Sequence, residues 1–378
     1  MMKILSIETS CDDTGIAVLE TSNSGDFKVL SNIVSSQIKI HKKYGGVFPA
    51  MAKREHQKNL VPVLISALKE SKLLEKGDEN IKTDELKNIL ERENVLHKKI
   101  IPFLKKYKKP NIDLISITNG PGLEPCLWVG VNLAKTLSYC WDIPLVSVNH
   151  IESHILVNYL NNKKIQLPAL SLVVSGGHTQ LILMEKIGKY TILGETRDDA
   201  AGECFDKTAK ILGLEYPGGP VISKLAKKAK RNYNINLPRP MINTKDYDFS
   251  FSGLKTAVLY FHQKQDKKTQ KSKEYINQMC FEIQQSIIDV LIKKTIKAAK
   301  DYNVKTIILG GGVSANKELQ KQFENKIQKE LPDTKYLFPD QSSLSTDNGL
   351  MTAITSFYHK KETTSWQKLE ADANLRIN

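Results

Sequence analysis

Two histidines and a distant aspartate are the residues of this chain best suited to hold a metal ion. His150 and His154 stand four residues apart, and Asp347 lies far downstream in Ser-Thr-Asp-Asn-Gly. Four residues make about one helical turn, so both imidazoles can point at the same ion. Two nitrogen ligands and one carboxylate leave coordination positions open for a substrate. The sequence therefore predicts an open metal site.

The position of Glu152 bears on what such a site could catalyse. A zinc protease of the H-E-x-x-H type carries its glutamate directly after the first histidine, where it activates a metal-bound water. Glu152 instead stands midway between His150 and His154. On a helix it therefore projects from a different side of the turn. A zinc protease is disfavoured on this spacing.

Glycine-rich turns offer three candidate phosphate sites. Each lies at the boundary of an expected strand or helix: Ser175-Gly176-Gly177-His178, Pro217-Gly218-Gly219-Pro220 and Gly310-Gly311-Gly312. Glycine permits positive φ and lets backbone amides face an anion. A Gly-Gly pair is also a common hairpin turn, but three such turns together favour a nucleotide in a cleft. The P-loop pattern G-x-x-x-x-G-K-[ST] does not occur.

Composition sets wider limits on function. The 378 residues include 55 Lys and Arg against 41 Asp and Glu, a formal net charge of +14. Such an excess favours a polyanionic partner, nucleic acid first, although a lysine-rich solvated surface explains it equally well. The five cysteines contain no C-x-x-C pair, which argues against a disulfide framework or zinc ribbon. We expect a cytoplasmic protein without a signal peptide or membrane span.

The expected secondary structure repeats itself along the chain. Strand, turn, strand, strand and helix are expected over residues 3–74, and the same order returns over residues 170–212. This pattern predicts an α/β protein built by internal duplication, with a cleft between its halves. Further alternation of strand and helix follows in both halves. The last glycine run is expected to open a helix near Ser314, where helix amides could meet phosphate.

The domain boundaries follow from this pattern. We predict an N-terminal lobe over residues 1–143 and a C-terminal lobe over 144–362 that includes the metal-ligand helix. Residues 75–111 are charged and mixed in sign, without a sustained apolar face, and are expected to form a partly helical surface insertion. The tail over 363–378 is polar and expected to fray.

Long motifs in a fixed order connect the chain to a known family. They are Ile7-Glu8-Thr9-Ser10-Cys11-Asp12, Tyr44-Gly45-Gly46-Val47, Gly120-Pro121-Gly122-Leu123, Asn149-His150-Ile151-Glu152-Ser153-His154, Val174-Ser175-Gly176-Gly177-His178-Thr179-Gln180, Phe205-Asp206-Lys207-Thr208-Ala209-Lys210, Phe249-Ser250-Phe251-Ser252-Gly253-Leu254-Lys255-Thr256 and Gly311-Gly312-Val313-Ser314-Ala315-Asn316. Together they resemble the bacterial TsaD family of tRNA N6-adenosine threonylcarbamoyltransferases, over the chain to about residue 356.

The resemblance implies a fold, a reaction and a metal. The fold is the duplicated actin/hexokinase/Hsp70-like (ASKHA) architecture, with an interdomain nucleotide cleft. The reaction transfers the threonylcarbamoyl group of threonylcarbamoyl-AMP to N6 of the adenine 3′ of the anticodon, in tRNAs that read codons starting with A. One divalent metal is implied, Fe²⁺ with Zn²⁺ as the alternative. Its ligands by this resemblance are His150, His154 and Asp347.

The resemblance also implies substrate contacts and partners. The positions matching the family's substrate contacts are Val173, Val174, Ser175, Gly176, Gly177, Asp206, Gly219 and Asn316. The implied partners are tRNA and two smaller proteins, a TsaB-like fold relative and a TsaE-like ATPase. The 75–111 stretch is longer than the family's usual connection, and Glu124-Pro125-Cys126 departs from many bacterial members.

Roles in catalysis are open for two further acids. Asp12 lies in the first turn and could handle a proton, with Glu8 as support, although turn capping explains both equally well. An ASKHA-fold small-molecule kinase competes with the transferase, but its magnesium would suit two histidines badly. A non-catalytic, nucleotide-dependent RNA-binding scaffold would need the cleft without the histidines.

Overall fold

The computed structural model describes residues 1–77, 81–162, 164–230 and 233–378. Residues 78–80 of the expected insertion lie outside this part of the chain. The described residues form two compact units. Unit 1 comprises residues 1–39, 47–164 and 347–377, and unit 2 comprises 40–46 and 165–346, together with Asn378. No helix in the described part is long and apolar enough to cross a bilayer.

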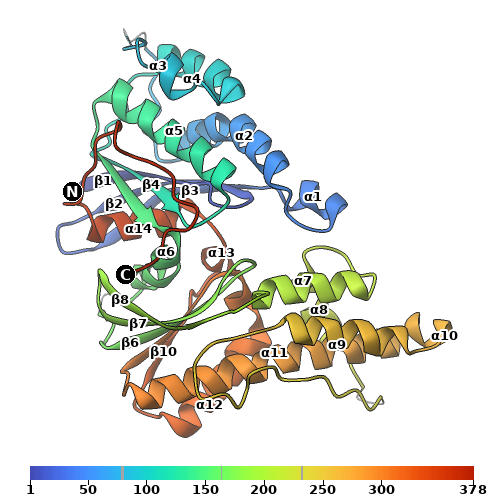
Figure 1. Cartoon of the computed structure of the whole chain (residues 1–378). Coiled ribbons are helices and arrows are strands. Elements are labelled where there is room, and N and C mark those ends of the chain that lie inside the picture. The colour runs from blue at the N-terminus through green and yellow to red at the C-terminus, as the bar shows by residue number, and fades with distance from the viewer. Residues whose placement is uncertain (78–80, 163, 231–232) are drawn as a thin grey trace. The chain divides into compact units, whose positions relative to one another are not determined.

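Unit 1 is built on a five-stranded mixed sheet (Figure 1). Its strands, in the order β3-β2-β1-β4-β5, are β3 (Phe27–Ser36), β2 (Asp13–Thr21), β1 (Met2–Glu8), β4 (Leu114–Gly120) and β5 (Leu145–Asn149). The first three pair antiparallel, whereas β4 and β5 join in parallel. The helices are α1 (Ile38–His41, which ends in unit 2), α2 (Pro49–Glu70), α3 (Leu86–Ile89), α4 (Asn94–Lys106), α5 (Glu124–Trp141), α6 (His150–Leu156), the 3₁₀ turn η2 (Val157–Leu160) and α14 (Gly349–Tyr358).

Unit 2 repeats the same sheet. Its strands, in the order β8-β7-β6-β9-β10, are β8 (Lys189–Glu195), β7 (Thr179–Lys186), β6 (Ala169–Val174), β9 (Thr306–Gly310) and β10 (Lys335–Leu337). Three antiparallel strands are again followed by two parallel ones. The predicted internal duplication is therefore confirmed by topology and by the direction of every pairing.

The helices of unit 2 include α11, the longest among the described residues. They are η1 (Lys42–Tyr44), α7 (Ala201–Ile211), α8 (Gly218–Ala226), α9 (Ser252–Gln263), α10 (Lys267–Gln270), α11 (Lys273–Asp301), η3 (Gly312–Ala315), α12 (Lys317–Glu330) and α13 (Ser342–Ser345). The helix expected near Ser314 is instead the 3₁₀ turn η3, and the α-helix starts three residues later. The side chain of Asn316 accepts hydrogen bonds from the first free amides of α12, which places the helix start there.

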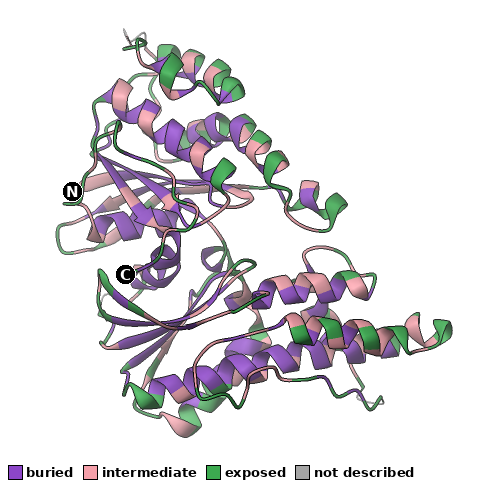
Figure 2. Cartoon of the chain, in the orientation of Figure 1, coloured by how far each residue is buried: buried purple, intermediate pink, exposed green. Residues whose placement is uncertain are grey.

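Alternation along β1 decides which side chains reach the metal region. Leu5 and Ile7 are fully buried in the apolar core under α2 and α5. Ser6 and Glu8 point to the opposite face, because successive strand side chains alternate. On that face Ser6 donates a hydrogen bond to the carbonyl of Gly349 in α14. Figure 2 shows α14 as almost wholly buried.

The expected insertion is better ordered than the sequence indicates. α4 has a buried apolar face, made by Leu96, Ile100, Phe103 and Leu104, that packs on α2. The prediction that residues 75–111 lack a sustained apolar face is therefore wrong. Two lysine pairs stand among and after these apolar residues in the sequence, so the face does not appear as a continuous hydrophobic run.

The C-terminal tail is docked, contrary to the expectation that it frays. Backbone amides of Thr364 and Asp372 donate to the carbonyls of Leu145 and Asn119. Leu369 is 2% exposed in the apolar core. A few apolar side chains spaced among polar ones anchor the segment, and such spacing gives no periodic signal.

The lobe boundary also differs from the prediction at residue 143. The α6 helix belongs to unit 1, with α14 and η2 packed against it. Residues 347–377 return to unit 1 after the whole of unit 2. The predicted second lobe, 144–362, therefore contains segments of both units. A chain that leaves a unit and returns to it cannot be divided at one point.

Candidate metal centre

The two histidines are carried by α6, which starts where β5 ends. The side chain of Asn149 accepts hydrogen bonds from the amides of Ile151 and Glu152, at 2.8 and 3.2 Å. Asn149 is thus the N-cap of α6 and sets His150 as the first helical residue. His154 follows one turn later on the same side of α6. The predicted helical pairing of the two imidazoles is present.

Asp347 completes a three-residue cluster inside unit 1. Its carboxylate lies 3.2 Å from Nε2 of His154 and 3.7 Å from Nε2 of His150. One donor atom from each of the three residues lies within 4.8 Å of the other two. Asp347 directly precedes α14, whose N-cap is Asn348. The start of α14 therefore delivers the carboxylate to the two imidazoles.

The donor set fits a metal ion. His154 is 1% exposed, and neither of its ring nitrogens has a hydrogen-bond partner among the described residues. Burying such groups without a partner is costly, so a bound cation would explain their placement. Two imidazoles and one carboxylate on one side of an ion are the pattern of sites with open coordination positions. These three residues could hold one metal.

Glu8 connects the metal cluster to the sheet. It is fully buried. Its carboxylate accepts from the Ser10 amide and from the Thr118 hydroxyl, both at 2.6 Å. Nδ1 of His150 lies 3.4 Å from Glu8 and 3.1 Å from the Ser10 hydroxyl. A carboxylate accepts only, so this contact favours a proton on Nδ1 and a lone pair on Nε2, the nitrogen that a metal would use.

Charge in the cluster agrees with this arrangement. Burial alone would lower the pKa of His150, but the carboxylates of Asp347 and Glu8 outweigh it and raise the pKa to about 9. Burial likewise would raise the pKa of Glu8, but the charge and hydrogen bond of His150 hold it below its ordinary value. The buried carboxylates thus favour a positive charge beside them, and a bound cation would supply such a charge.

The first turn, between β1 and β2, brings two more acids to this region. Asp12 lies in the turn, partly buried, and its carbonyl accepts from the Gln37 amide. Burial raises the pKa of the adjacent Asp13 to about 7, and the charges of Asp347 and Asp12 add to the increase. The turn is held from behind by His56 of α2, which contacts the Thr14 hydroxyl and the Cys11 carbonyl.

The side chain of Glu152 points away from the side of α6 that carries His150 and His154. Its carboxylate lies 2.9 Å from Nε2 of His359, the residue that follows α14. This ion pair joins the middle of α6 to the end of α14, whose beginning carries Asp347. Glu152 therefore connects the helices that supply the ligands, which agrees with the argument against a protease.

Five of the predicted substrate positions, residues 173–177, lie in unit 2 at the end of β6 and in the turn that leads to β7. Val173 and Val174 are buried in β6, so only their backbone is available to a ligand. The Ser175 amide donates to the His178 carbonyl, and the His178 amide donates to the Ser175 hydroxyl. Gly176 and Gly177 are exposed, with open space where a side chain would stand.

Two glycines allow other elements to approach this turn. A side chain at Gly202, in the first turn of α7, would lie 2.5 Å from the Ser175 carbonyl oxygen. Gly311 has φ +83°, and a side chain there would lie 2.4 Å from the Val174 carbonyl oxygen. Both contacts require glycine. The amides at the start of α7 and the η3 turn are thereby brought next to the Gly176-Gly177 turn.

The remaining predicted positions have structural partners of their own. Asp206 accepts a hydrogen bond from the Gly218 amide at 2.7 Å, beside Gly219, and lines a small cavity of about 130 Å³. Asn316 accepts from the amides of Glu318 and Leu319 and donates to Gln284. The side-chain oxygen of Asn316 is therefore used in capping α12, which leaves chiefly its amide group for a ligand.

The repeated sheet order and the cluster of His150, His154 and Asp347 define a class of protein. It is an actin/hexokinase/Hsp70-like (ASKHA) fold with a candidate metal centre, as predicted. Solved structures agree on the fold: full-length HypF in its phosphate- and nucleotide-bound form (TM-score 0.53, 12% identity) and HypF from T. kodakarensis (0.53, 12%). They cover 97% and 96% of this chain, and it covers 47% and 49% of theirs.

The family follows from sequence comparison. The family model for TsaD, tRNA N6-adenosine threonylcarbamoyltransferase, matches residues 28–79 and 98–354. A tRNA N6-adenosine threonylcarbamoyltransferase from Thermosipho africanus is 44% identical over 377 residues, covering 100% of both chains. The Bacillus cereus enzyme of that name is 42% identical over 352 residues, 93% of this chain and 89% of the relative. The chain belongs to this family of acyltransferases.

Sequence reasoning missed three residues of unit 1 that lie close to the cluster. Ser10 contacts His150, Asp13 is a partly buried acid with a raised pKa, and His359 pairs with Glu152. Ser10 and Asp13 lie in the motif around Asp12, so the motif itself was a usable signal. His359 stands far from any motif, and only its packing reveals it.

Proposed function

We propose that this chain transfers the threonylcarbamoyl group of threonylcarbamoyl-AMP to N6 of the adenine 3′ of the anticodon, in tRNAs reading codons that start with A. The product is threonylcarbamoyladenosine. The observation that carries the proposal is the buried cluster of His150, His154 and Asp347, in which neither ring nitrogen of His154 has a hydrogen bond to a described residue. Membership in the transferase family supports the choice of reaction.

The proposed chemistry explains why a metal is needed. An exocyclic adenine amine is a poor nucleophile, so the acyl group must arrive activated as a mixed anhydride. A metal held by His150, His154 and Asp347 would act as a Lewis acid on the acyl donor. We propose Fe²⁺ as the ion and Zn²⁺ as the alternative, since imidazole and carboxylate ligands suit both and suit magnesium badly.

Residues of unit 2 are proposed to bind the adenylate. The exposed amides of Gly176 and Gly177 would donate to its phosphate oxygens, as preorganised donors do for developing negative charge. Val173, Val174 and Ser175 would contribute backbone groups next to them. Asp206, Gly219 and Asn316 would contact the nucleoside portion, with Asp206 also setting the start of α8.

Roles for the first turn of unit 1 are also proposed. Glu8 holds the Nδ1 side of His150 and would act as a positioning residue, because its buried carboxylate is enclosed by protein groups. Asp12, in the same turn and partly exposed, would handle the proton that leaves the attacking amine. This assignment favours the proton-handling interpretation of Asp12 over simple capping.

The proposal includes partners and a compartment. By membership in the family the substrate is tRNA, and we propose TsaB-like and TsaE-like proteins as partners. All five cysteines are free thiols, which supports a reducing compartment, the cytoplasm.

Substitution of a ligand tests the proposal. His150→Ala is assayed with threonylcarbamoyl-AMP, substrate tRNA and both partners, followed by chromatography of the nucleosides. We expect the yield of modified adenosine to fall below detection, together with the metal content of the purified protein. The control is His262→Gln, on α9 of unit 2, which also removes one imidazole. Normal yield from His150→Ala would overturn the metal assignment, and a scaffold would keep its RNA binding.

A further inference from the structure

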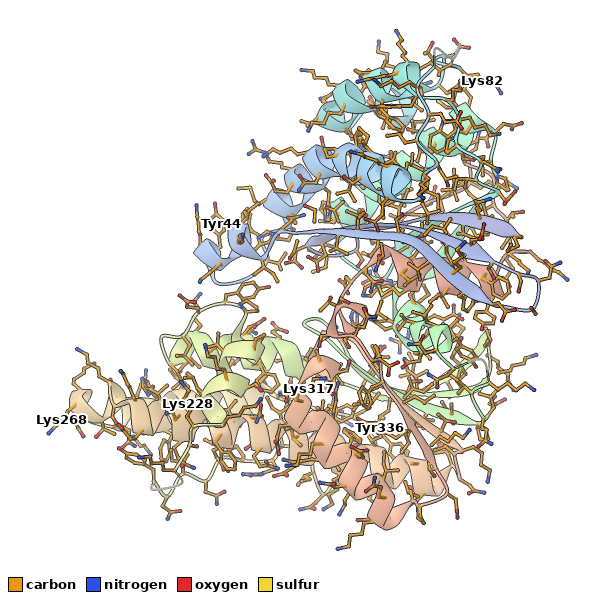
Figure 3. All side chains as sticks on the ribbon, turned by 180° about the vertical axis from the view of Figure 1, so that it is seen from behind. Tyr44, Lys82, Lys228, Lys268, Lys317 and Tyr336 are labelled. Atoms are coloured by element: carbon orange, nitrogen blue, oxygen red, sulfur yellow. The ribbon has the colours of Figure 1, made fainter. Side chains whose placement is uncertain are left out.

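The α4 helix carries a concentrated positive surface that the proposed function does not use. From Asn94 to Ile112 the chain has six lysines and no acidic residue, so this short segment holds a large part of the net charge of +14. All six side chains are exposed: Lys98, Lys99, Lys105, Lys106, Lys108 and Lys109. Figure 3 shows side chains of the α3–α4 segment extending away from the ribbon.

The lysines of α4 lie on one side of the helix. At about 100° per residue, Lys98 and Lys105 differ by roughly 20° in direction, and so do Lys99 and Lys106. The four fall within an arc of about 120°, whose centre is roughly 150° from that of the buried apolar residues. Each pair is seven residues, or about 10.5 Å, apart along the axis. We call these four residues the lysine face of α4.

The lysine face is held rigidly on unit 1. Glu93, just before α4, is 1% exposed, accepts from Gln57 of α2 at 2.6 Å and pairs with Lys53 at 3.1 Å. Gln57 in turn accepts from the Val95 amide. The same α2 helix holds the first turn through His56. A ligand on the lysine face would therefore be fixed relative to the metal cluster, which belongs to the same unit.

The lysines of this surface have fewer polar and charged partners than those of another basic region. A groove of about 1050 Å³ between α11 and α12 also contains several lysines. There Lys300 and Lys326 pair with Glu330, and Lys297 bonds to a backbone carbonyl. On α4, Lys99 donates to the Lys58 carbonyl, but neither Lys98 nor Lys105 has an ion pair or hydrogen bond with any described residue. The lysine face is therefore the less compensated of the two.

We propose that the lysine face of α4 binds the phosphate backbone of the substrate tRNA, outside the reacting adenosine. The proposal rests on the proposed function for the presence of tRNA. Exposed lysines without acidic neighbours are the chemistry of sequence-independent phosphate contact. Lysine also makes point-charge contacts, not the planar two-point contacts of arginine, so the surface adds affinity and orientation but no sequence readout.

The role of the lysine face is tested by measuring how tRNA binding depends on salt concentration. The affinity of the full chain for a substrate tRNA and for a non-substrate tRNA is measured by fluorescence anisotropy across a range of salt concentrations. For K98Q/K105Q we expect Kd at low salt to rise on the order of tenfold for both tRNAs. The slope of log Kd against log salt should fall by about 1.4 to 1.8, since each lost phosphate contact contributes about 0.7 to 0.9.

The matched control removes two lysines elsewhere. K227Q/K228Q neutralises two exposed lysines at the end of α8 in unit 2, and Lys228 is labelled in Figure 3. It should change Kd less than twofold. Unchanged Kd and slope for K98Q/K105Q, or equal losses in both variants, would overturn the lysine face while leaving the transfer reaction intact. Absence of tRNA binding by the wild-type chain would overturn both proposals.

Discussion

The first turns of the two sheets occupy equivalent places in the repeat but differ in chemistry. In unit 1, β1 ends at Glu8 and the turn that follows contains Asp12, next to the partly buried Asp13 that begins β2. In unit 2, β6 ends at Val174 and the turn contains Gly176 and Gly177. The first is acidic and joined by side-chain hydrogen bonds to neighbouring helices, whereas the second is formed by backbone groups and open to solvent.

The difference shows how one fold can prepare for two kinds of ligand. Carboxylates and imidazoles suit a cation, and a network of hydrogen bonds must hold them in position. Exposed backbone amides suit an anion, and glycine must leave room for its approach. Duplication supplies two copies of the same strand–turn–strand, and the side chains placed on the copies decide the charge of what each can bind.

The largest difference between the two regions is expected in the stability of glycine-to-alanine variants at or next to each turn. A side chain at Gly15, in β2 of unit 1, would lie 2.7 Å from the Gly349 amide nitrogen and 3.1 Å from backbone atoms of Asn348. Backbone cannot move aside easily, so Gly15→Ala should lower the free energy of unfolding by about 1–3 kcal/mol. Gly177→Ala meets open space and should change it by less than about 0.5 kcal/mol.

Urea denaturation of both variants measures this contrast. Because Asn348 and Gly349 follow Asp347, Gly15→Ala should also weaken metal binding, which a chelator competition would detect. Equal stability of the two alanine variants would show that the close contact between β2 and α14 is not maintained in solution.

The next largest effect, on metal affinity, is expected when the hydrogen bonds around Glu8 are disturbed. In Glu8→Gln, the amide oxygen would keep the hydrogen bond from the Ser10 amide, so the amide NH₂ would face Nδ1 of His150 and two donors would oppose each other. His150 would then favour the tautomer with the proton on Nε2, the nitrogen proposed to bind metal. We expect metal affinity to fall by about tenfold to a hundredfold, measured by competition with a chelator of known affinity.

The control for this variant is Glu20→Gln, on β2 of the same sheet, where the glutamate pairs with Lys3 and Lys28. It removes the same charge at a position remote from the histidines in the chain. Metal affinity that is unchanged in Glu8→Gln would contradict the positioning role of Glu8.

Much of this arrangement could be predicted from the sequence, for identifiable reasons. The central strands of both sheets gave clear apolar runs, and the metal ligands combined a helical spacing with distinctive residue types. Contacts that depend on distant segments gave no such signal. The docking of Leu369, the apolar face of α4 and the Glu152–His359 pair each join residues that lie far from their partners in the chain, so local periodicity could not reveal them.

The domain division failed for a related reason. Sequence order suggested that one lobe ends before the other begins, but α14 returns to the first sheet and brings Asp347 with it. The Ser6 hydroxyl bonds to Gly349, and Thr118 lies 3.1 Å from Thr352. These buried polar contacts use small side chains without a recognisable pattern. They fix the helix that carries the third ligand, and only the folded chain brings them together.

The smallest effect on stability is expected from the ion pair between Glu152 and His359 in unit 1, and this effect depends on pH. The hydrogen bond to Glu152 raises the pKa of His359 to about 9, from an ordinary value of about 6.5. Because the folded-state pKa is raised, the pair contributes its full stability below about pH 6.5 and loses it as pH rises through about 9. The difference in unfolding free energy between wild type and His359→Gln should therefore shrink from pH 6 to pH 10. Denaturation curves at those two pH values provide the measurement, and a difference independent of pH would show that protonated His359 does not join α6 to α14.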